Sequence, residues 1–459
     1  MTHGRPSHYP HPIPDTSWAD GLRGIASLFV VSSHLVLCFA RGIVPPSQSY
    51  DGPSSLFQRP FLRLIGQGNA FVALFFVLLG FVNPLKAIQQ SRAGSVPDAL
   101  STLSRSCLRR SSRLVLPAAV VTVISWLLCQ LNFFYLAQRA DAYWLQETTP
   151  WPSGSWGQAT VDLMRELVST WATGQNRYDQ PQWALPHLFR GSMVIFMVLL
   201  ATVNTTPTFR VAVEIILYVW SWVSYDSIVL INVFAGMILA ELSFLPPPNT
   251  KSKTANILPY LLAILGLYLC SYPDQFAEQA LWSRQLMYIG TLIFPQRAQL
   301  GRYWPGLGAQ LLCLAIVRSP SMRQALSKPY LTWLGWVSYP IYLLHGTIIR
   351  TFMTWLTFGP MALISAPQHE SNDDQLPAEP PSLIPGPSKL ALIFTLPIFF
   401  IILLAVATAW AAKVDPLFEK VAATIERFAR TWGKKGVNSG GYGSPPRKPN
   451  GSILPTFAP

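Results

Sequence analysis

Two ionisable side chains, Arg23 and His34, lie eleven residues apart in a segment that is otherwise mostly apolar or small. On a helix that turns about 100° per residue, they share an arc of about 60° with Asp20 and Ser27. Ionisable groups at membrane depth are energetically costly and normally face a bundle interior or a water-filled cavity, so this face is a candidate functional site. A hydrogen bond in helix packing, or an arginine that reaches the membrane interface, is the alternative interpretation.

A second histidine, His345, lies in another apolar segment, where helical spacing places it on one face with Ser338 and Tyr342. Both segments are predicted to cross in the same direction, with each histidine at a depth of roughly 20 Å, so the two imidazoles are expected at one level. Imidazole ionises near pH 6.5 and can take a proton from a hydroxyl at neutral pH. Two histidines at matched depth favour catalysis, whereas a single one is more often a packing residue.

An arginine-rich run, Arg109-Arg110-Ser-Ser-Arg113, precedes the third apolar segment. Arginine binds phosphate in a bidentate fashion, so Arg110 and Arg113 are candidates for holding the phosphates of a nucleotide-bearing donor such as acyl-CoA. The alternative is ordinary anchoring of a membrane helix by positive charge on its cytoplasmic side. The sequence leaves both interpretations open.

The composition indicates a membrane protein. The chain has 459 residues, of which 50% are hydrophobic and only 12% charged, whereas soluble domains carry about 25% charge. The formal charge of +13 is spread over short connections between apolar segments, which argues against nucleic-acid binding and indicates membrane topology. The five cysteines have no paired spacing that would predict a disulfide framework or a zinc site, and no metal is expected.

Hydropathy predicts an all-α, polytopic membrane helix bundle with about ten transmembrane helices. The expected spans are 20–40, 70–86, 114–132, 184–203, 211–225, 227–245, 256–271, 306–317, 331–350 and 390–412. Longer connections are expected at 41–69, 133–183, 272–305 and 351–389, the last with a Pro-rich irregular stretch at 377–387. A cytoplasmic N-terminus puts every short basic connection on one side, and an even number of spans puts the C-terminal tail there too. The stretch 414–432 is expected to form an amphipathic helix on the membrane surface.

Six short motifs together resemble the membrane-bound acyltransferase 3 family, in the branch common in filamentous fungi. In the family's order, they are Asp20-Gly-Leu-Arg23-Gly-Ile-Ala with His34, Phe75-Phe76-x-x-x-Gly80-Phe81, Arg109-Arg110-x-x-Arg113-Leu-x-Leu-Pro117, Trp183-x-x-Pro186 with Phe189-Arg190-Gly191-Ser192, Phe234-Ala-Gly236-x-x-x-x-Glu241-Leu, and Ser338-Tyr339-x-x-Tyr342-Leu-Leu-His345-Gly346. The resemblance implies a ten-helix bundle that moves an acyl group, usually acetyl from acetyl-CoA, onto a hydroxyl of a sugar, lipid or secondary metabolite. It also associates Arg23 and His34 with activity.

Two positions depart from the family pattern. Leu79 stands where members usually have serine, and Leu188 stands where they commonly have glutamate. If that carboxylate orients a catalytic group or the acceptor, its loss is expected to change the acceptor or slow turnover. The neighbouring His187 points about 100° away from position 188 on a helix, which limits its ability to compensate.

The residues and the resemblance together predict an integral membrane O-acyltransferase. His34 is the expected general base, and His345 is a second polar group near the point of acyl transfer. Asp20 or Arg23 would position the acceptor hydroxyl or steady charge. Acetyl-CoA or another acyl-CoA is the expected donor, which Arg110 and Arg113 would hold by its phosphates. The expected partners are a small hydroxylated acceptor and membrane lipid, and no nucleic acid.

The acyltransferase domain is expected over residues 20–412, between a cytoplasmic N-terminal segment (1–19) and a basic cytoplasmic tail (413–459). The expected location is the endoplasmic reticulum or another endomembrane, with several membrane crossings and both termini in the cytoplasm. The alternative function is a transporter, or a catalytically inactive bundle, that uses the buried histidine and arginine as a proton relay or packing network.

Overall fold

The computed structural model describes residues 13–245, 253–364 and 383–431, and regular structure in these ranges is helical apart from one isolated bridge between Ala140 and Ile384. The predicted all-α class is therefore confirmed. In chain order the helices are α1 (Ser17–Phe39), α2 (Gly68–Val82), α3 (Leu85–Arg92), α4 (Val96–Gln130), α5 (Tyr135–Arg139), α6 (Tyr143–Thr148), α7 (Trp156–Ala172), α8 (Ala184–Thr202), α9 (Pro207–Val223), α10 (Leu230–Ser243), α11 (Lys253–Cys270), α12 (Leu281–Ile293), α13 (Leu300–Arg318), α14 (Pro320–Leu326), α15 (Pro329–Ile348), α16 (Thr354–Ile364), α17 (Lys389–Lys413) and α18 (Asp415–Thr431). Short 3₁₀ turns form η1 (Arg41–Ile43), η2 (Leu56–Gln58), η3 (Leu62–Gly66), η4 (Gln180–Trp183) and η5 (Ala277–Gln279), and a π-turn forms η6 (Ile349–Met353).

Every span expected from hydropathy coincides with a helix, namely α1, α2, α4, α8, α9, α10, α11, α13, α15 and α17. The largest difference between an expected span and its helix is at α4, which begins at Val96, well before the span expected at 114–132. Pro97 and Asp98 in its first turn favour a helix start, but this polar stretch does not raise the hydropathy. Within the described residues, the helical stretches long and apolar enough to cross a membrane are five: Ser17–Phe39, Gly68–Arg92, Val96–Gln130, Gln180–Thr202 and Lys389–Ala429. The count of ten crossings stays a prediction.

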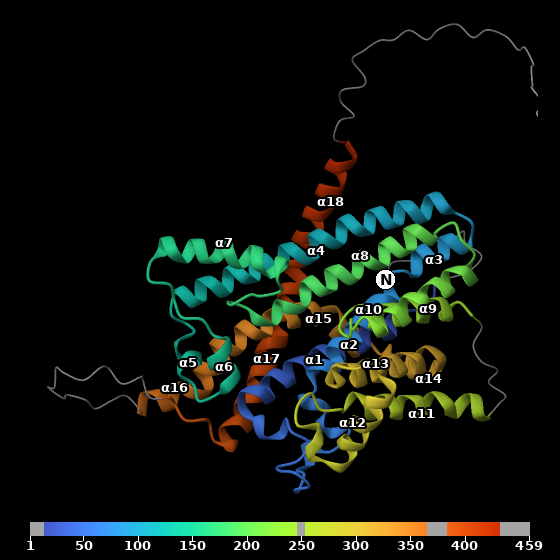
Figure 1. Cartoon of the computed structure of the whole chain (residues 1–459). Helices are drawn as coiled ribbons and strands as arrows, with labels where there is room; N and C mark the ends of the chain where they lie inside the picture. The colour runs from blue at the N-terminus through green and yellow to red at the C-terminus, as the bar shows by residue number, and fades with distance from the viewer. Residues whose placement is uncertain (1–12, 246–252, 365–382, 432–459) are drawn as a thin grey trace, which may run out of the picture.

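Helices α1 and α15 pack against each other at the centre of the bundle (Figure 1). Glycines make this close approach possible. A Cβ atom at Gly335 would lie 2.2 Å from the carbonyl oxygen of Asp20, and one at Gly24 would lie 2.6 Å from the backbone nitrogen of Gly335. Small residues at such a contact let two helix backbones come together in a membrane bundle. The two histidine-bearing helices are therefore in direct backbone contact.

Helix α2 forms the centre of the largest apolar core. It packs against α1, α8, α10 and α13, and its side chains Phe76 and Val77 have no exposed surface. Its mostly apolar sequence matches this position, because a helix that is apolar on all sides is stable only when it is surrounded by other helices or lipid. Side chains of α1 belong to the same apolar core, so α2 holds α1 in place as well.

The connection expected at 133–183 is largely helical and forms α5, α6, α7 and η4. Helix α6 contacts α1, and η4 contacts α15. In Figure 1 these elements lie together with α16 on the left, whereas α3 and α14 lie toward the right. We call the side of the bundle formed by α5, α6 and η4 the loop end, and the side where α1 and α15 begin the basic end. The Pro-rich stretch expected at 377–387 lies for most of its length outside the described residues.

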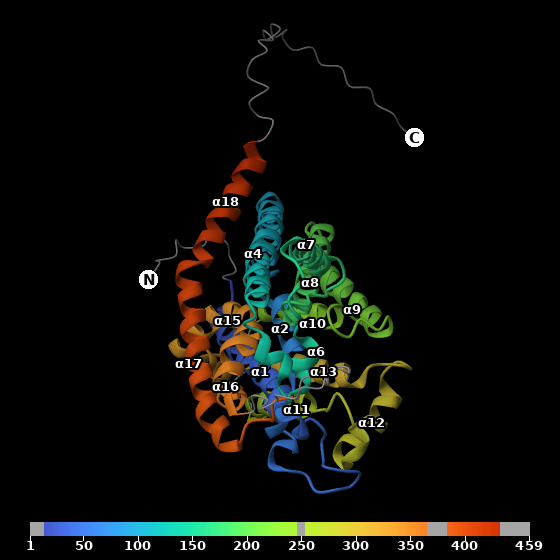
Figure 2. The ribbon, with the colours of Figure 1, turned by 90° about the vertical axis from the view of Figure 1, so that its left-hand side faces the viewer.

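The amphipathic segment expected at 414–432 is helix α18, which follows α17 along one edge of the molecule (Figure 2). Helix α18 packs against the first half of α4. Its carboxylates face the arginines of α4, as described below. Contact with another helix thus uses at least one face of α18.

Candidate active site

Helices α1 and α15 bring His34 and His345 together near the loop end, with ring centroids 5.1 Å apart. The expectation of two imidazoles at one level is met. The His345 side chain has no exposed surface, and His34 is half-buried. The two rings therefore form a histidine pair between two closely packed helices.

The backbone of α15 fixes the tautomer of His345. Its Nδ1 lies 2.7 Å from the carbonyl oxygen of Tyr342 and 3.2 Å from that of Ile341. A carbonyl oxygen only accepts, so in the neutral ring Nδ1 carries the proton and donates, while Nε2 has the lone pair. Nε2 of His345 and Nδ1 of His34 are both buried, and neither has a hydrogen-bond partner among the described residues. The histidine pair therefore leaves polar nitrogens available to a ligand.

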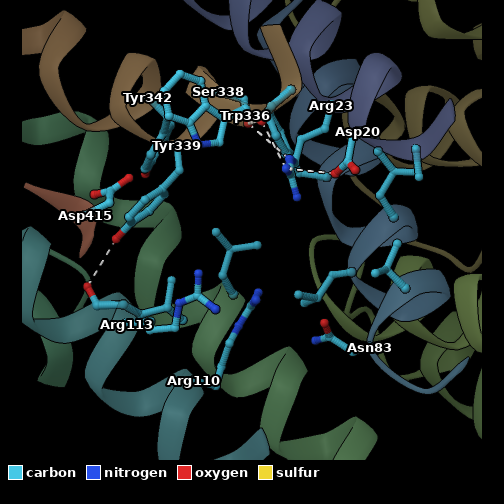
Figure 3. A pocket seen from close by; sticks show the side chains of 18 of the residues that line it. Asp20, Arg23, Asn83, Arg110, Arg113, Trp336, Ser338, Tyr339, Tyr342 and Asp415 are labelled. Carbon is cyan, nitrogen blue, oxygen red and sulfur yellow. Dashed lines mark hydrogen bonds and ion pairs between the residues drawn. The ribbon is translucent and has the colours of Figure 1, made fainter. Parts of the chain in front are cut away.

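A cavity of about 780 Å³ lies at the basic end and is lined by residues of α1, α2, α4, α8 and α15 (Figure 3). Its inner lining includes Val30 and Tyr342, which lie one helical turn before His34 and His345. The Tyr342 hydroxyl donates a hydrogen bond to the carbonyl oxygen of Pro181, and its ring centroid lies 6.1 Å from that of His345. Tyr342 thus separates the inner part of the cavity from the histidine pair.

Arg23 and Asp20 line this cavity and lie away from the histidines. They form an ion pair at 3.0 Å, and Arg23 also donates from Nε to the Ser338 hydroxyl and from Nη2 to the Gly335 carbonyl, both at 3.0 Å. Eleven residues along a helix correspond to about 16 Å, so Arg23 does not reach the His34 ring. Arg23 instead connects α1 to α15 at the wall of the cavity.

The arginines Arg110 and Arg113 of α4 face the same cavity and point toward its interior with Arg23 (Figure 3). Nε of Arg110 is buried and has no hydrogen-bond partner among the described residues. Arg113 is paired with Glu419 of α18 at 2.7 Å, and Glu426 of the same helix pairs with neighbouring arginines of α4. The cavity therefore has one wall that carries guanidinium groups, which suits an anionic ligand.

The opposite wall of the cavity is apolar. Leu79 and Leu188, the two departures from the family pattern, both line it. The other apolar side chains of this wall come from α1, α2 and α8 and include Val30, Val72, Phe75, Phe76, Leu78, Val82 and Phe196. His187 lines a different cavity of about 570 Å³, together with Arg190 and Asp226. His187 therefore does not take the place of a carboxylate at position 188.

Residues of the loop end cover the histidine pair, and sequence reasoning did not identify them. The Trp144 ring of α6 lies 4.8 Å from the His34 ring and 4.9 Å from the guanidinium carbon of Arg350. Asp179, next to η4, is nine-tenths buried or more, and burial raises the pKa of its carboxyl to about 6 although Arg350 opposes this shift. The sequence does give one indication of Arg350. This arginine lies five positions after His345, at the end of the span that is predicted to face away from the cytoplasm, where the positive-inside rule does not favour basic residues.

No group of three or more His, Cys, Asp or Glu side chains within the described part of the chain is arranged to hold a metal ion. The cysteines Cys38, Cys107, Cys129, Cys270 and Cys313 are free thiols, and all except Cys107 are buried. The polar side chains that line the large cavity include guanidinium groups, carboxylates, hydroxyls and the amide of Asn83.

Comparison with known proteins gives a match over most of the chain. The model of the acyltransferase 3 family, described as an acyltransferase domain, matches residues 16–413. The O-acetyltransferase PaAT-1 of Phomopsis amygdali is 27% identical over 385 residues, which cover 77% of this chain and 76% of that protein. The acyltransferase clz18 of Cochliobolus lunatus is 25% identical over 410 residues, which cover 76% of this chain and 85% of that protein. No solved structure matches.

Proposed function

The chain belongs to the acyltransferase 3 family, and from this premise we propose that it is an integral membrane O-acyltransferase. It moves an acyl group, which we propose to be acetyl, from acyl-CoA to a hydroxyl of a small acceptor. The name of the relative from Phomopsis amygdali, an O-acetyltransferase, supports transfer of acetyl to oxygen. The observation that carries the proposal is the histidine pair, whose unpartnered ring nitrogens lie one helical turn beyond Val30 and Tyr342 in the lining of an arginine-lined cavity.

The chemistry assigned to the pair is general base catalysis. His34 takes the proton of the acceptor hydroxyl, because His34 keeps some exposed surface whereas His345 has none. His345 holds its own proton on Nδ1, so its Nε2 is available to accept a hydrogen bond from protonated His34. The hydroxyl oxygen attacks the thioester carbon, the C–S bond breaks, and the proton leaves on the thiol of CoA. A covalent acyl-histidine is the alternative route, with the same groups in place.

The donor is assigned to the cavity at the basic end. Its phosphates would meet Arg110 and Arg113, and Arg23 offers a further positive charge at the wall formed by α1 and α15. The thioester arm would then run along the apolar wall toward the histidine pair. Because Leu79 and Leu188 make this wall apolar, it suits a hydrophobic arm or an apolar acceptor such as a secondary metabolite or lipid.

A transporter, or a bundle without catalytic activity, is the competing function, because buried histidine and arginine also build proton relays. Purified protein incubated with radiolabelled acetyl-CoA and a panel of sugars, lipids and hydroxylated metabolites separates the two. We expect label in at least one acceptor, with release of free CoA. Label that stays in acetyl-CoA across the whole panel would contradict the enzymatic function.

We further propose that both termini face the cytoplasm, with the protein in the endoplasmic reticulum or another endomembrane. The basic end then faces the cytoplasm, where acyl-CoA is present. A C-terminal tag in sealed microsomes should be accessible to added protease. A protected tag would mean that the chain crosses the membrane an odd number of times.

A further inference from the structure

Arg350 is a buried cation at the loop end of the bundle. It lies in η6, directly after α15, and its side chain has no exposed surface. Enclosing a guanidinium group without full compensation is costly, so such a residue is a candidate for function. It lies five positions after His345, on the same continuous helical stretch.

The contacts of Arg350 leave part of its guanidinium group unused. Nη2 donates to the Thr148 hydroxyl at 3.0 Å and to the Thr148 carbonyl at 3.2 Å. The nearest acid is Asp179, whose Oδ1 lies 3.8 Å from Nη1, a distance too long for a hydrogen bond. A purely structural ion pair between these groups would use short, bidentate hydrogen bonds. Asp179 instead accepts a hydrogen bond from Gln182 at its other oxygen, at 2.9 Å.

Several unpartnered polar atoms gather around this residue. Nε and Nη1 of Arg350, Oδ1 of Asp179, Nδ1 of His34 and Nε2 of His345 are all buried and have no hydrogen-bond partner among the described residues. Buried polar atoms are paired in the great majority of cases. Trp144 contacts both the His34 ring and the Arg350 guanidinium group, so these atoms belong to one site. The combination of N–H donors and ring nitrogens fits a polar ligand that has both a hydroxyl and a carbonyl oxygen.

Resting on the proposed acyl transfer, we propose that Arg350 is a catalytic residue whose free N–H groups stabilise the oxyanion of the tetrahedral intermediate. When the acceptor oxygen bonds to the thioester carbon, the electron pair of the C=O bond moves onto oxygen and His34 holds the hydroxyl proton. Arg350 donates hydrogen bonds to this oxygen. The C=O bond then forms again as the C–S bond breaks, and the thiolate takes the proton.

The test compares Arg350→Gln with the double variant Asp179→Asn/Arg350→Gln. The single change leaves a buried carboxyl group without its counter-charge and can impair folding, whereas the double variant is neutral at both positions. Removing one oxyanion donor typically lowers kcat by about 10² to 10³. We expect this loss in both variants, with the KM for acetyl-CoA little changed and the double variant monodisperse and thermally stable like the parent. Arg350→Lys keeps a positive charge beside Asp179 and N–H donors but not the planar fork of the guanidinium group, so we expect a smaller loss of kcat in this variant.

A second readout separates catalysis from structure. Trifluoroacetonyl-CoA has a ketone that readily forms a tetrahedral centre resembling the intermediate, and analogues of this kind depend on transition-state contacts. The variants should lose about 10² or more in affinity for it and keep the affinity of the parent for CoA. A double variant with kcat within threefold of the parent, or equal losses for analogue and CoA, would overturn the role of Arg350. A parent protein that acylates nothing would instead overturn the proposed function.

Discussion

Replacing Gly335 by alanine should separate the histidine pair without touching either ring. An added Cβ would lie 2.2 Å from the Asp20 carbonyl oxygen, whereas a relaxed carbon–oxygen contact is about 3.3 Å or longer. Both partners are helix backbone, so the relief has to come from moving α1 and α15 apart by about 1 Å. Overpacking of this kind costs about 1–3 kcal/mol of stability. A 1 Å misplacement of reacting groups can lower the rate about 10²-fold.

The matched control is Gly42→Ala, because a Cβ atom at Gly42 would meet nothing within 4 Å. The assay is single-turnover transfer of labelled acetyl to the acceptor found with the panel, together with thermal melts of both variants in detergent. We expect Gly42→Ala to behave like the parent and Gly335→Ala to be about 10²-fold slower while still folded. Equal rates for the two variants would refute the view that the α1–α15 contact sets the geometry of the site.

Further predictions concern the anion-binding wall and the loop end. Lysine at both Arg110 and Arg113 keeps the positive charge but not the bidentate fork. The KM for acetyl-CoA should therefore rise about 10- to 150-fold, equivalent to about 1.5–3 kcal/mol, with little change in the KM for the acceptor. An unchanged KM for acetyl-CoA would mean that the two arginines are topological anchors. Glu419→Gln removes the carboxylate that pairs with Arg113 at 2.7 Å and so frees that guanidinium group for the donor phosphates. Because exposed ion pairs contribute about 0.2–1 kcal/mol, the KM for acetyl-CoA should fall by at most about fivefold. A rise in this KM would show that Glu419 supports donor binding. Burial raises the pKa of Asp179 from 3.8 to about 6, so the folded state binds its proton more tightly than the unfolded state, and this group's contribution to the free energy of unfolding declines as the pH increases through that window. Thermal melts between pH 4.5 and 7.5 should therefore show Asp179→Asn gaining stability relative to the parent as the pH rises, and a constant difference would contradict this.

The helices and the histidine pair could be predicted because both depend on local properties of the chain. A long apolar segment is sufficient to predict a span, and a fixed rise per residue converts sequence position into depth. His34 and His345 were therefore expected at one level before their contact was known. The glycines that make the contact close are also visible in the sequence, but the partner that each one faces is not.

The loop-end residues could not be predicted, since their positions depend on how long connections fold back. Asp179 and Trp144 lie in the connection 133–183, and nothing in local sequence places that connection over the ends of α1 and α15. The first turns of α4 were not predicted because a hydropathy profile detects apolar segments and not polar helical turns. The pairing of Arg113 with Glu419 joins residues about 300 positions apart, and a charge pattern alone does not select such partners.

The most direct test of acyl transfer at the histidine pair is the rate of labelled acetyl transfer by purified His34→Ala, measured beside His187→Ala. Both variants remove one imidazole, but His187 lines the other cavity. A general base contributes about 10²- to 10⁴-fold to the rate. We therefore expect His34→Ala to express, insert and melt like the parent and to lose at least 10² in kcat, with His187→Ala fully active. Activity of His34→Ala within about threefold of the parent, well below the contribution of a general base, would contradict the assignment of this pair as the catalytic centre.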